Sequence, residues 1–170
     1  MTIRGEQLIA WSEMLGGAIG LVVLLPIAAY EHVVPLSAIY YVSSALGFVL
    51  SIVAGWRLLR RQVGGRELSL VVQVLQVLQV TALGWSIQYA AGLQVLVKIE
   101  RGMFMVSPGA NAGMWFGPTY SPLPWMVAVN LFALWASVHL VRALRRANMM
   151  VGPMPEVTGT LTPPSPMRPA

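Results

Sequence analysis

An all-α membrane protein, with four transmembrane helices packed as a bundle, is the fold that the sequence predicts. Hydrophobic residues make up 56% of the 170 residues and charged residues only 10%, and the mean hydropathy is +0.69. The charges also occur in short clusters that separate long uncharged segments. Both observations are typical of integral membrane proteins rather than of soluble domains. The net charge of +5 is not spread along one polar face, so we expect no nucleic-acid partner.

Four segments are long enough to cross a lipid bilayer, for which a helix needs roughly 20 apolar residues. We predict transmembrane helices over residues 8–30, 36–56, 68–97 and 124–141. Together with an outer loop over 98–123, they form a membrane domain of residues 1–149. The third segment carries no charge along its whole length, so we expect that helix to tilt. Residues 150–170 are rich in proline and are predicted to be a disordered cytoplasmic tail.

The distribution of cations predicts the orientation of the bundle, because cytoplasmic loops retain Lys and Arg. Lys98 and Arg101 are the cations of the predicted outer loop. The opposite side receives two clusters of arginines, which we also expect to attract anionic lipid: Arg57, Arg60, Arg61, Arg66, Arg142, Arg145 and Arg146. We therefore expect both termini to be cytoplasmic (N-in, C-in), in a plasma (inner) membrane.

Small residues recur at helical spacing on the first two predicted helices. The second helix has one of them every four residues, at Ser43, Gly47, Ser51 and Gly55. Gly16 and Gly20 form a similar face on the first helix. Helices approach closely along such faces, so we predict an antiparallel hairpin packed through these residues.

The predicted third helix carries an unusual number of amides, at Gln73, Gln76, Gln79, Gln88 and Gln94. On a helix they cover half of the circumference, and that face must avoid lipid because unsatisfied amides are costly there. We interpret them as interhelical hydrogen-bonding groups, with Asn130 of the fourth helix as a partner. The alternative is that they line a path for a polar solute.

Glu13 is an acidic residue close to the start of the first predicted helix. We interpret it as an interfacial carboxylate that faces Arg57 or Arg60, since acidic residues are favoured in the first turns of a helix. The alternative is a proton-coupled carboxylate at the inner mouth of a path.

The chain contains no catalytic motif that we identify: aspartate and cysteine are missing, and the glutamates are scattered. We therefore expect no catalytic residue, no cofactor and no metal. The sequence favours a non-catalytic integral membrane accessory or scaffold protein, which contacts the lipid bilayer and binds other membrane subunits or itself through helix–helix contacts. The alternatives are a small-solute transporter or channel with a glutamine-lined path, and a lipid-modifying enzyme that uses the outer loop as its substrate platform.

Overall fold

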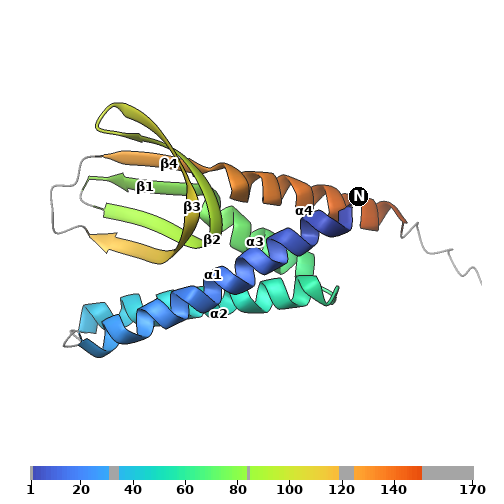
Figure 1. Ribbon diagram of the computed structural model, residues 1–170, viewed down its shortest axis with the longest axis horizontal. Coiled ribbons are helices and arrows are strands. Elements are labelled where there is room, and N and C mark those ends of the chain that lie inside the picture. The colour runs from blue at the N-terminus through green and yellow to red at the C-terminus, as the bar shows by residue number, and fades with distance from the viewer. Residues whose placement is uncertain (1, 31–34, 84, 119–124, 151–170) are drawn as a thin grey trace, which may run out of the picture.

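A computed structural model describes residues 2–30, 35–83, 85–118 and 125–150, and these residues form four helices and four strands (Figure 1). In chain order the elements are α1 (Thr2–Tyr30), α2 (Pro35–Leu59), α3 (Gly65–Val77), β1 (Leu78–Ala82), β2 (Trp85–Glu100), β3 (Met103–Pro118), β4 (Met126–Asn130) and α4 (Leu131–Met150). The predicted tail over 150–170 lies, after Met150, outside the described residues.

The prediction of an all-α bundle with four transmembrane helices is wrong, because an antiparallel sheet replaces much of its second half. The predicted third span, 68–97, consists of most of α3, all of β1 and most of β2. The predicted outer loop, 98–123, contains the end of β2 and all of β3, and the predicted fourth span begins as β4. Two stretches, Arg4–Pro26 in α1 and Tyr40–Leu59 in α2, are long and apolar enough to cross a membrane.

The break in the predicted third span has a local cause that hydropathy does not register. α3 ends at Val77, and Leu78 already has an extended backbone with φ −113° and ψ 128°. β-branched residues, which favour strands, follow at Val80 and Thr81, and the chain then reverses, so that Ala82 pairs with Trp85. Leu83 in that turn has a φ of 53°, as tight hairpin turns require.

β2 and β3 form a long hairpin with a second tight turn. Its two central residues, Arg101 and Gly102, have φ values of 52° and 78°, which is the left-handed pair of a type I′ turn. The strands pair in register from Glu100 and Met103 at the turn to Trp85 and Pro118 at the far end.

The sheet curls because β2 bends. β1 pairs with the first residues of β2, β4 pairs with the last residues of β2, and β1 also pairs with β4. These three strands therefore close on one another, while β3 runs along the outer edge of β2. Gly92 lies between the two pairing regions of β2 and has a φ of 110°, a conformation that only glycine adopts readily.

α1 and α2 lie side by side along the length of the molecule, with α3 and α4 beside the N-terminal half of α1 and the sheet beside its C-terminal half (Figure 1). Glycines set the distance between α1 and α2. A Cβ at Gly20 would lie 2.5 Å from the ring of Phe48, and one at Gly55 would lie 2.5 Å from the carbonyl oxygen of Ala10.

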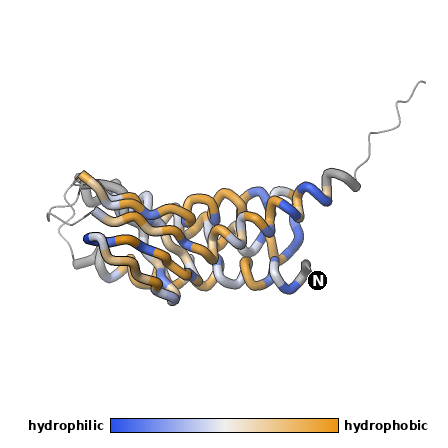
Figure 2. Tube along the Cα trace, turned by 90° about the horizontal axis from the view of Figure 1, so that it is seen from above, coloured by the Kyte–Doolittle hydropathy of each residue, from blue (hydrophilic) through white to orange (hydrophobic). Residues whose placement is uncertain are grey.

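Strongly hydrophilic residues lie mainly toward the ends of the long axis, and hydrophobic ones dominate between them (Figure 2).

Candidate functional site

The strongest candidate site is a buried polar centre, which we define as Glu13 with Ser69 and Gln73. The Glu13 side chain is completely buried. Ser69 Oγ donates to Glu13 Oε2 over 2.8 Å, and Gln73 Nε2 donates to Oε1 over 2.9 Å. Ser69 and Gln73 are four residues apart on α3, so both side chains lie on one face of that helix. α2 closes the centre from another side, since a Cβ at Gly55 would lie 3.2 Å from the Glu13 Cβ.

The expected pairing of Glu13 with Arg57 or Arg60 is wrong. Within the described part of the chain, ion pairs join Arg66 to Glu6 and Lys98 to Glu100. Arg60 instead lies over the ring of Trp56, 4.5 Å from its centroid. Glu13 meets neutral donors because the face of α3 that is directed toward it carries Ser69 and Gln73 rather than cations.

Next to the polar centre, side chains take the place of a missing strand. Among the described residues, β2 has no strand neighbour on its inner edge between its pairings with β1 and β4. Three successive inward N–H groups, of Ala91, Leu93 and Val95, donate instead to side-chain oxygens. The acceptors are Gln76 Oε1 at 3.1 Å, Ser12 Oγ at 2.8 Å and Asn130 Oδ1 at 3.2 Å. The bent strand is thus held by α1, α3 and the residue that precedes α4.

Asn130 has a second role at the start of α4. Its Oδ1 also accepts hydrogen bonds from the N–H groups of Phe132 and Ala133, over 3.1 and 3.3 Å. An asparagine that accepts from the second and third N–H groups is a helix N-cap. The completely buried Asn130 therefore joins the end of the sheet to the start of the last helix.

α1 crosses β2 at a point where each of the two elements has a glycine. A Cβ at Gly16 would collide with the backbone of Ala91 and Gly92, and one at Gly92 would collide with Ser12. Gly16 was expected to face a neighbouring helix, and the structure places it against the strand instead. This close approach lets Ser12 Oγ reach the Leu93 N–H.

The small-residue face of α2 also receives part of the sheet. The Tyr89 hydroxyl donates to the carbonyl oxygen of Gly47 over 2.7 Å and hydrogen-bonds with the Ser51 hydroxyl. Ser43 lies about two turns before Ser51 on α2 and donates locally to the Tyr40 carbonyl oxygen. The pKa of Tyr89 is raised to about 12, mainly by burial; the hydrogen bond with Ser51 opposes the rise and the nearby Glu13 contributes to it. The tyrosine is therefore neutral at physiological pH.

The five glutamines do not share one helical face. Gln73 and Gln76 lie on α3, Gln79 lies on β1, and Gln88 and Gln94 lie on β2. Gln88 Nε2 donates to the hydroxyls of Thr81 and Ser86 within the β1–β2 hairpin. Several buried amide atoms have no partner among the described residues: Gln73 Oε1, Gln76 Nε2, Gln79 Nε2, Gln94 Oε1 and Asn130 Nδ2.

The chemistry of the polar centre is hydrogen bonding around one carboxyl group. Nucleophilic or acid–base catalysis commonly combines a nucleophile with a base and an orienting group, and the centre supplies one titratable residue. In the described ranges, no three His, Cys, Asp or Glu residues are grouped so that they could hold a metal ion. No protein-family model, curated protein or solved structure matches the chain, so its function is argued from these contacts.

Two members of this network, Ser12 and Tyr89, were not selected from the sequence. Ser12 directly precedes Glu13, and its role depends on a strand 81 residues further along the chain. Tyr89 carried a recognisable signal, because a tyrosine in the middle of a long apolar segment needs a partner for its hydroxyl.

Proposed function

We propose that this chain is an integral membrane protein with a non-catalytic accessory or scaffold role, embedded in the bilayer through α1 and α2. The observation that carries the proposal is the exposure of large apolar side chains at spacings of three and four residues along both helices. On α1 they are Leu8, Trp11, Leu15, Ile19 and Val22; on α2 they are Val42, Leu46, Val49, Val53 and Trp56. Each of these side chains is at least 40% exposed. In water such continuous stripes would be unfavourable, whereas lipid acyl chains suit them.

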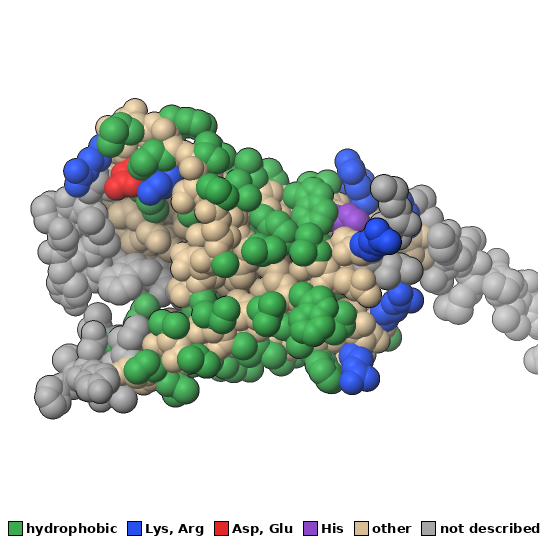
Figure 3. Space-filling view, viewed as in Figure 1, with side chains coloured by type: hydrophobic (Ala, Val, Ile, Leu, Met, Phe, Trp, Pro, Cys, Tyr) green, Lys and Arg blue, Asp and Glu red, His purple; other side chains and the backbone are tan. Residues whose placement is uncertain are grey.

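α4 supports the same proposal. It exposes Leu131, Leu134, Trp135 and Val138, again at helical spacing. We call the exposed apolar side chains of α1, α2 and α4 together the apolar belt; Figure 3 shows its green side chains along the middle of the molecule. Trp11 lies in the first half of α1 and Trp56 in the last turn of α2, in the parts of both helices that approach the end at which the arginines gather, as tryptophans do at a membrane–water interface.

The arginines support an orientation. α1 starts, α2 ends and α4 ends at the same end of the molecule (Figure 1), where blue side chains gather in Figure 3. We call this the arginine end. In our proposal it faces the cytoplasm of a plasma (inner) membrane, with both chain termini on that side, because cytoplasmic segments retain arginine.

The scaffold role is supported by how the buried polar groups are used. Glu13, Ser69, Ser12 and Asn130 hydrogen-bond to other parts of the same chain, which fixes the sheet and the helices relative to each other. A rigid unit with a large apolar surface suits association with other membrane subunits or with a second copy. The second candidate, passage of a small polar solute, is favoured by the buried amide atoms of Gln73, Gln76 and Gln79 that have no partner in the described part of the chain.

Membrane embedding is tested by extraction of membranes with alkaline carbonate. Wild-type protein is expected to remain in the pellet, and the double variant Val49→Glu/Val53→Glu to be lost from it, because two charges would then face lipid. Val63→Glu is the matched control, since Val63 is 94% exposed in the α2–α3 turn, outside the apolar belt. Release of the wild-type protein by carbonate would contradict the proposal.

The accessory role is tested by native mass spectrometry of protein extracted in mild detergent. A stable complex with another membrane protein, or a defined homo-oligomer, is the expected result. A lone monomer, together with solute flux in proteoliposomes that Gln76→Leu abolishes, would favour the transport candidate instead.

A further inference from the structure

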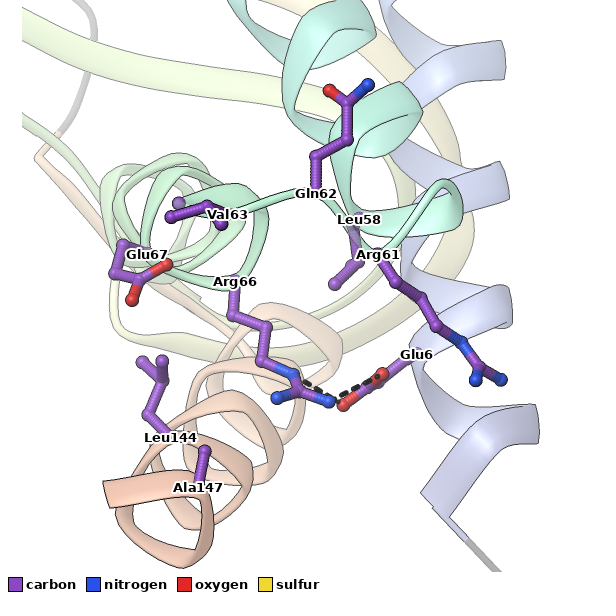
Figure 4. A pocket seen from close by; sticks show the side chains of 10 residues that line it. Glu6, Leu58, Arg61, Gln62, Val63, Arg66, Glu67, Leu144 and Ala147 are labelled. Carbon is purple, nitrogen blue, oxygen red and sulfur yellow. Dashed lines mark hydrogen bonds and ion pairs between the residues drawn. The ribbon is translucent and has the colours of Figure 1, made fainter. Parts of the chain in front are cut away.

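The arginine end contains a hollow of about 250 Å³ that the function proposed above does not use. It lies between the start of α1, the α2–α3 turn, the start of α3 and the last turns of α4 (Figure 4). α3 packs tightly against the end of α2 beside it, since a Cβ at Gly65 would lie 2.8 Å from the carbonyl group of Arg57. The hollow is therefore formed by four parts of the chain that the fold holds together.

One arginine of the hollow is fixed by an ion pair. Arg66 Nε donates to Glu6 Oε1 over 3.0 Å, and Arg66 Nη2 donates to Oε2 over 3.4 Å. Figure 4 shows the two side chains pointing toward each other. The charges of Glu6 and Arg66 compensate each other, and the two-point contact, which uses Nε and Nη2, keeps the Arg66 guanidinium in one place.

A second arginine, Arg61, also lines the hollow, and Figure 4 shows its side chain extending past Glu6, on the side away from Arg66. Its backbone is in the left-handed region, with a φ of 54°, and it stands in the turn that closes α2 through the bond from the Gln62 N–H to the Arg57 carbonyl oxygen. Within the described residues its guanidinium has no ion pair. Glu67, the other acidic residue of the lining, lies on the opposite side of the hollow from Arg61 (Figure 4).

Two further features suit an anion that carries an apolar group. α3 starts at the hollow with Gly64 as its N-cap and no side chain capping it, so its positive end adds to the field of the arginines. Leu58, Val63, Leu144 and Ala147 supply apolar lining.

We propose that this hollow binds the phosphate group of one anionic phospholipid, with Arg61 as the principal contact and Arg66 as a second, positioned cation. The inference rests on the proposed membrane embedding, because only then do lipid headgroups lie at this end. A phosphate accepts two parallel hydrogen bonds from a guanidinium, and the lipid glycerol and first acyl carbons meet the apolar lining. A lipid with a quaternary ammonium group is disfavoured, since its positive charge would face the surrounding arginines.

The test uses purified full-length protein in mixed micelles that contain equal amounts of phosphatidylglycerol and phosphatidylcholine. Native mass spectrometry counts the lipids that remain bound. Wild-type protein is expected to retain one phosphatidylglycerol in preference to phosphatidylcholine. Arg61→Gln should reduce that preference roughly tenfold, the effect of losing one charge-assisted hydrogen-bonded pair, and Arg61→Lys should recover part of it.

Arg145→Gln is the matched control, because it removes the same charge from α4 at the same end but does not line the hollow. An equal loss in Arg61→Gln and Arg145→Gln would overturn the proposal in favour of a diffuse field. Unchanged retention in an Arg61→Gln protein with a native circular-dichroism spectrum would overturn it as well. Displacement of the lipid by millimolar inorganic phosphate would assign the hollow to free phosphate instead. The micelle assay does not require embedding, so release of the wild type by carbonate identifies failure of the proposed function separately.

Discussion

At the scale of single residues, Glu13 shows how a buried carboxyl group is accommodated without a cation. Its two oxygens accept from Ser69 and Gln73, and an unmade bond at a buried donor costs about 1–3 kcal/mol. We therefore expect Glu13→Ala to lower the free energy of unfolding by about 2–4 kcal/mol, because two donors lose their acceptor. Glu13→Gln, which keeps one acceptor and nearly the same volume, should cost less. Thermal unfolding in detergent measures both, and a Glu13→Ala protein as stable as wild type would contradict this account.

Tyr89 gives a pH-dependent prediction at the same scale. Its pKa of about 12 in the folded protein lies above the value of about 10 of an unfolded chain. A raised folded pKa means that the stabilisation is fully present below pH 10 and is lost as the pH rises toward 12. Tyr89→Phe should thus be less stable than wild type at pH 8, where the bond to Gly47 is lost, and this difference should shrink between pH 10 and 12. Unfolding of both proteins, measured at pH 8 and again between pH 10 and 12, tests this prediction. A stability difference that stays constant with pH would contradict the raised pKa of Tyr89.

At the scale of elements, the sequence allows α1 and α2 to be predicted but not the sheet. Predicted spans 8–30 and 36–56 fall within α1 and α2, because both segments are apolar and helix-compatible throughout. The segment 68–97 is equally apolar, but its conformation depends on the partners that β2 finds in β1, β3 and β4. Hydropathy cannot contain that information, since strand pairing joins residues far apart in the chain.

For the candidate site, the sequence likewise indicates which residues matter but not which partners they have. Glu13, Gln73, Gln76 and Asn130 stood out as polar residues in apolar segments, and all four lie in the hydrogen-bonded interior. Their partners were predicted wrongly or not at all, because a straight third helix places Gln73 and Gln79 beside Gln76, whereas the bend into strands brings the backbone of Ala91 to it instead.

The crossing of α1 and β2 gives the prediction that belongs to elements. Gly92 combines a φ of 110° with close contact to Ser12, so Gly92→Ala should destabilise the protein by about 3 kcal/mol or more. Gly109→Ala is the control within the same hairpin, since a Cβ there meets nothing within 4 Å, and its effect should stay within about 0.5 kcal/mol. Thermal unfolding of both variants measures the difference. Equal effects would mean that α1 does not approach the strand at Gly92.

At the scale of the whole molecule, the architecture itself can be tested because the chain has no cysteine of its own. Leu93 is paired with Ala110 across β2 and β3, and the Leu93 N–H points away from β3, toward Ser12. The two residues therefore form a non-hydrogen-bonded pair, in which side chains lie closest. Leu93→Cys/Ala110→Cys should form an intramolecular disulfide without reductant, whereas Leu93→Cys/Val106→Cys, four positions out of register, should not.

Tryptic digestion followed by mass spectrometry reads the result, because cleavage after Lys98 and Arg101 places the two cysteines on separate peptides unless a disulfide joins them. A helix over 68–97 followed by a loop over 98–123 would give no register preference between the two pairs. Cross-linking of the 93–110 pair alone would therefore establish the hairpin of the folded chain, and with it the bent strand on which Ser12, Gln76 and Asn130 converge. Equal cross-linking of both pairs, or of neither, would contradict the β2–β3 hairpin and favour a helical or irregular second half. The hydrogen bonds from β2 to Ser12, Gln76 and Asn130 would then not form as described.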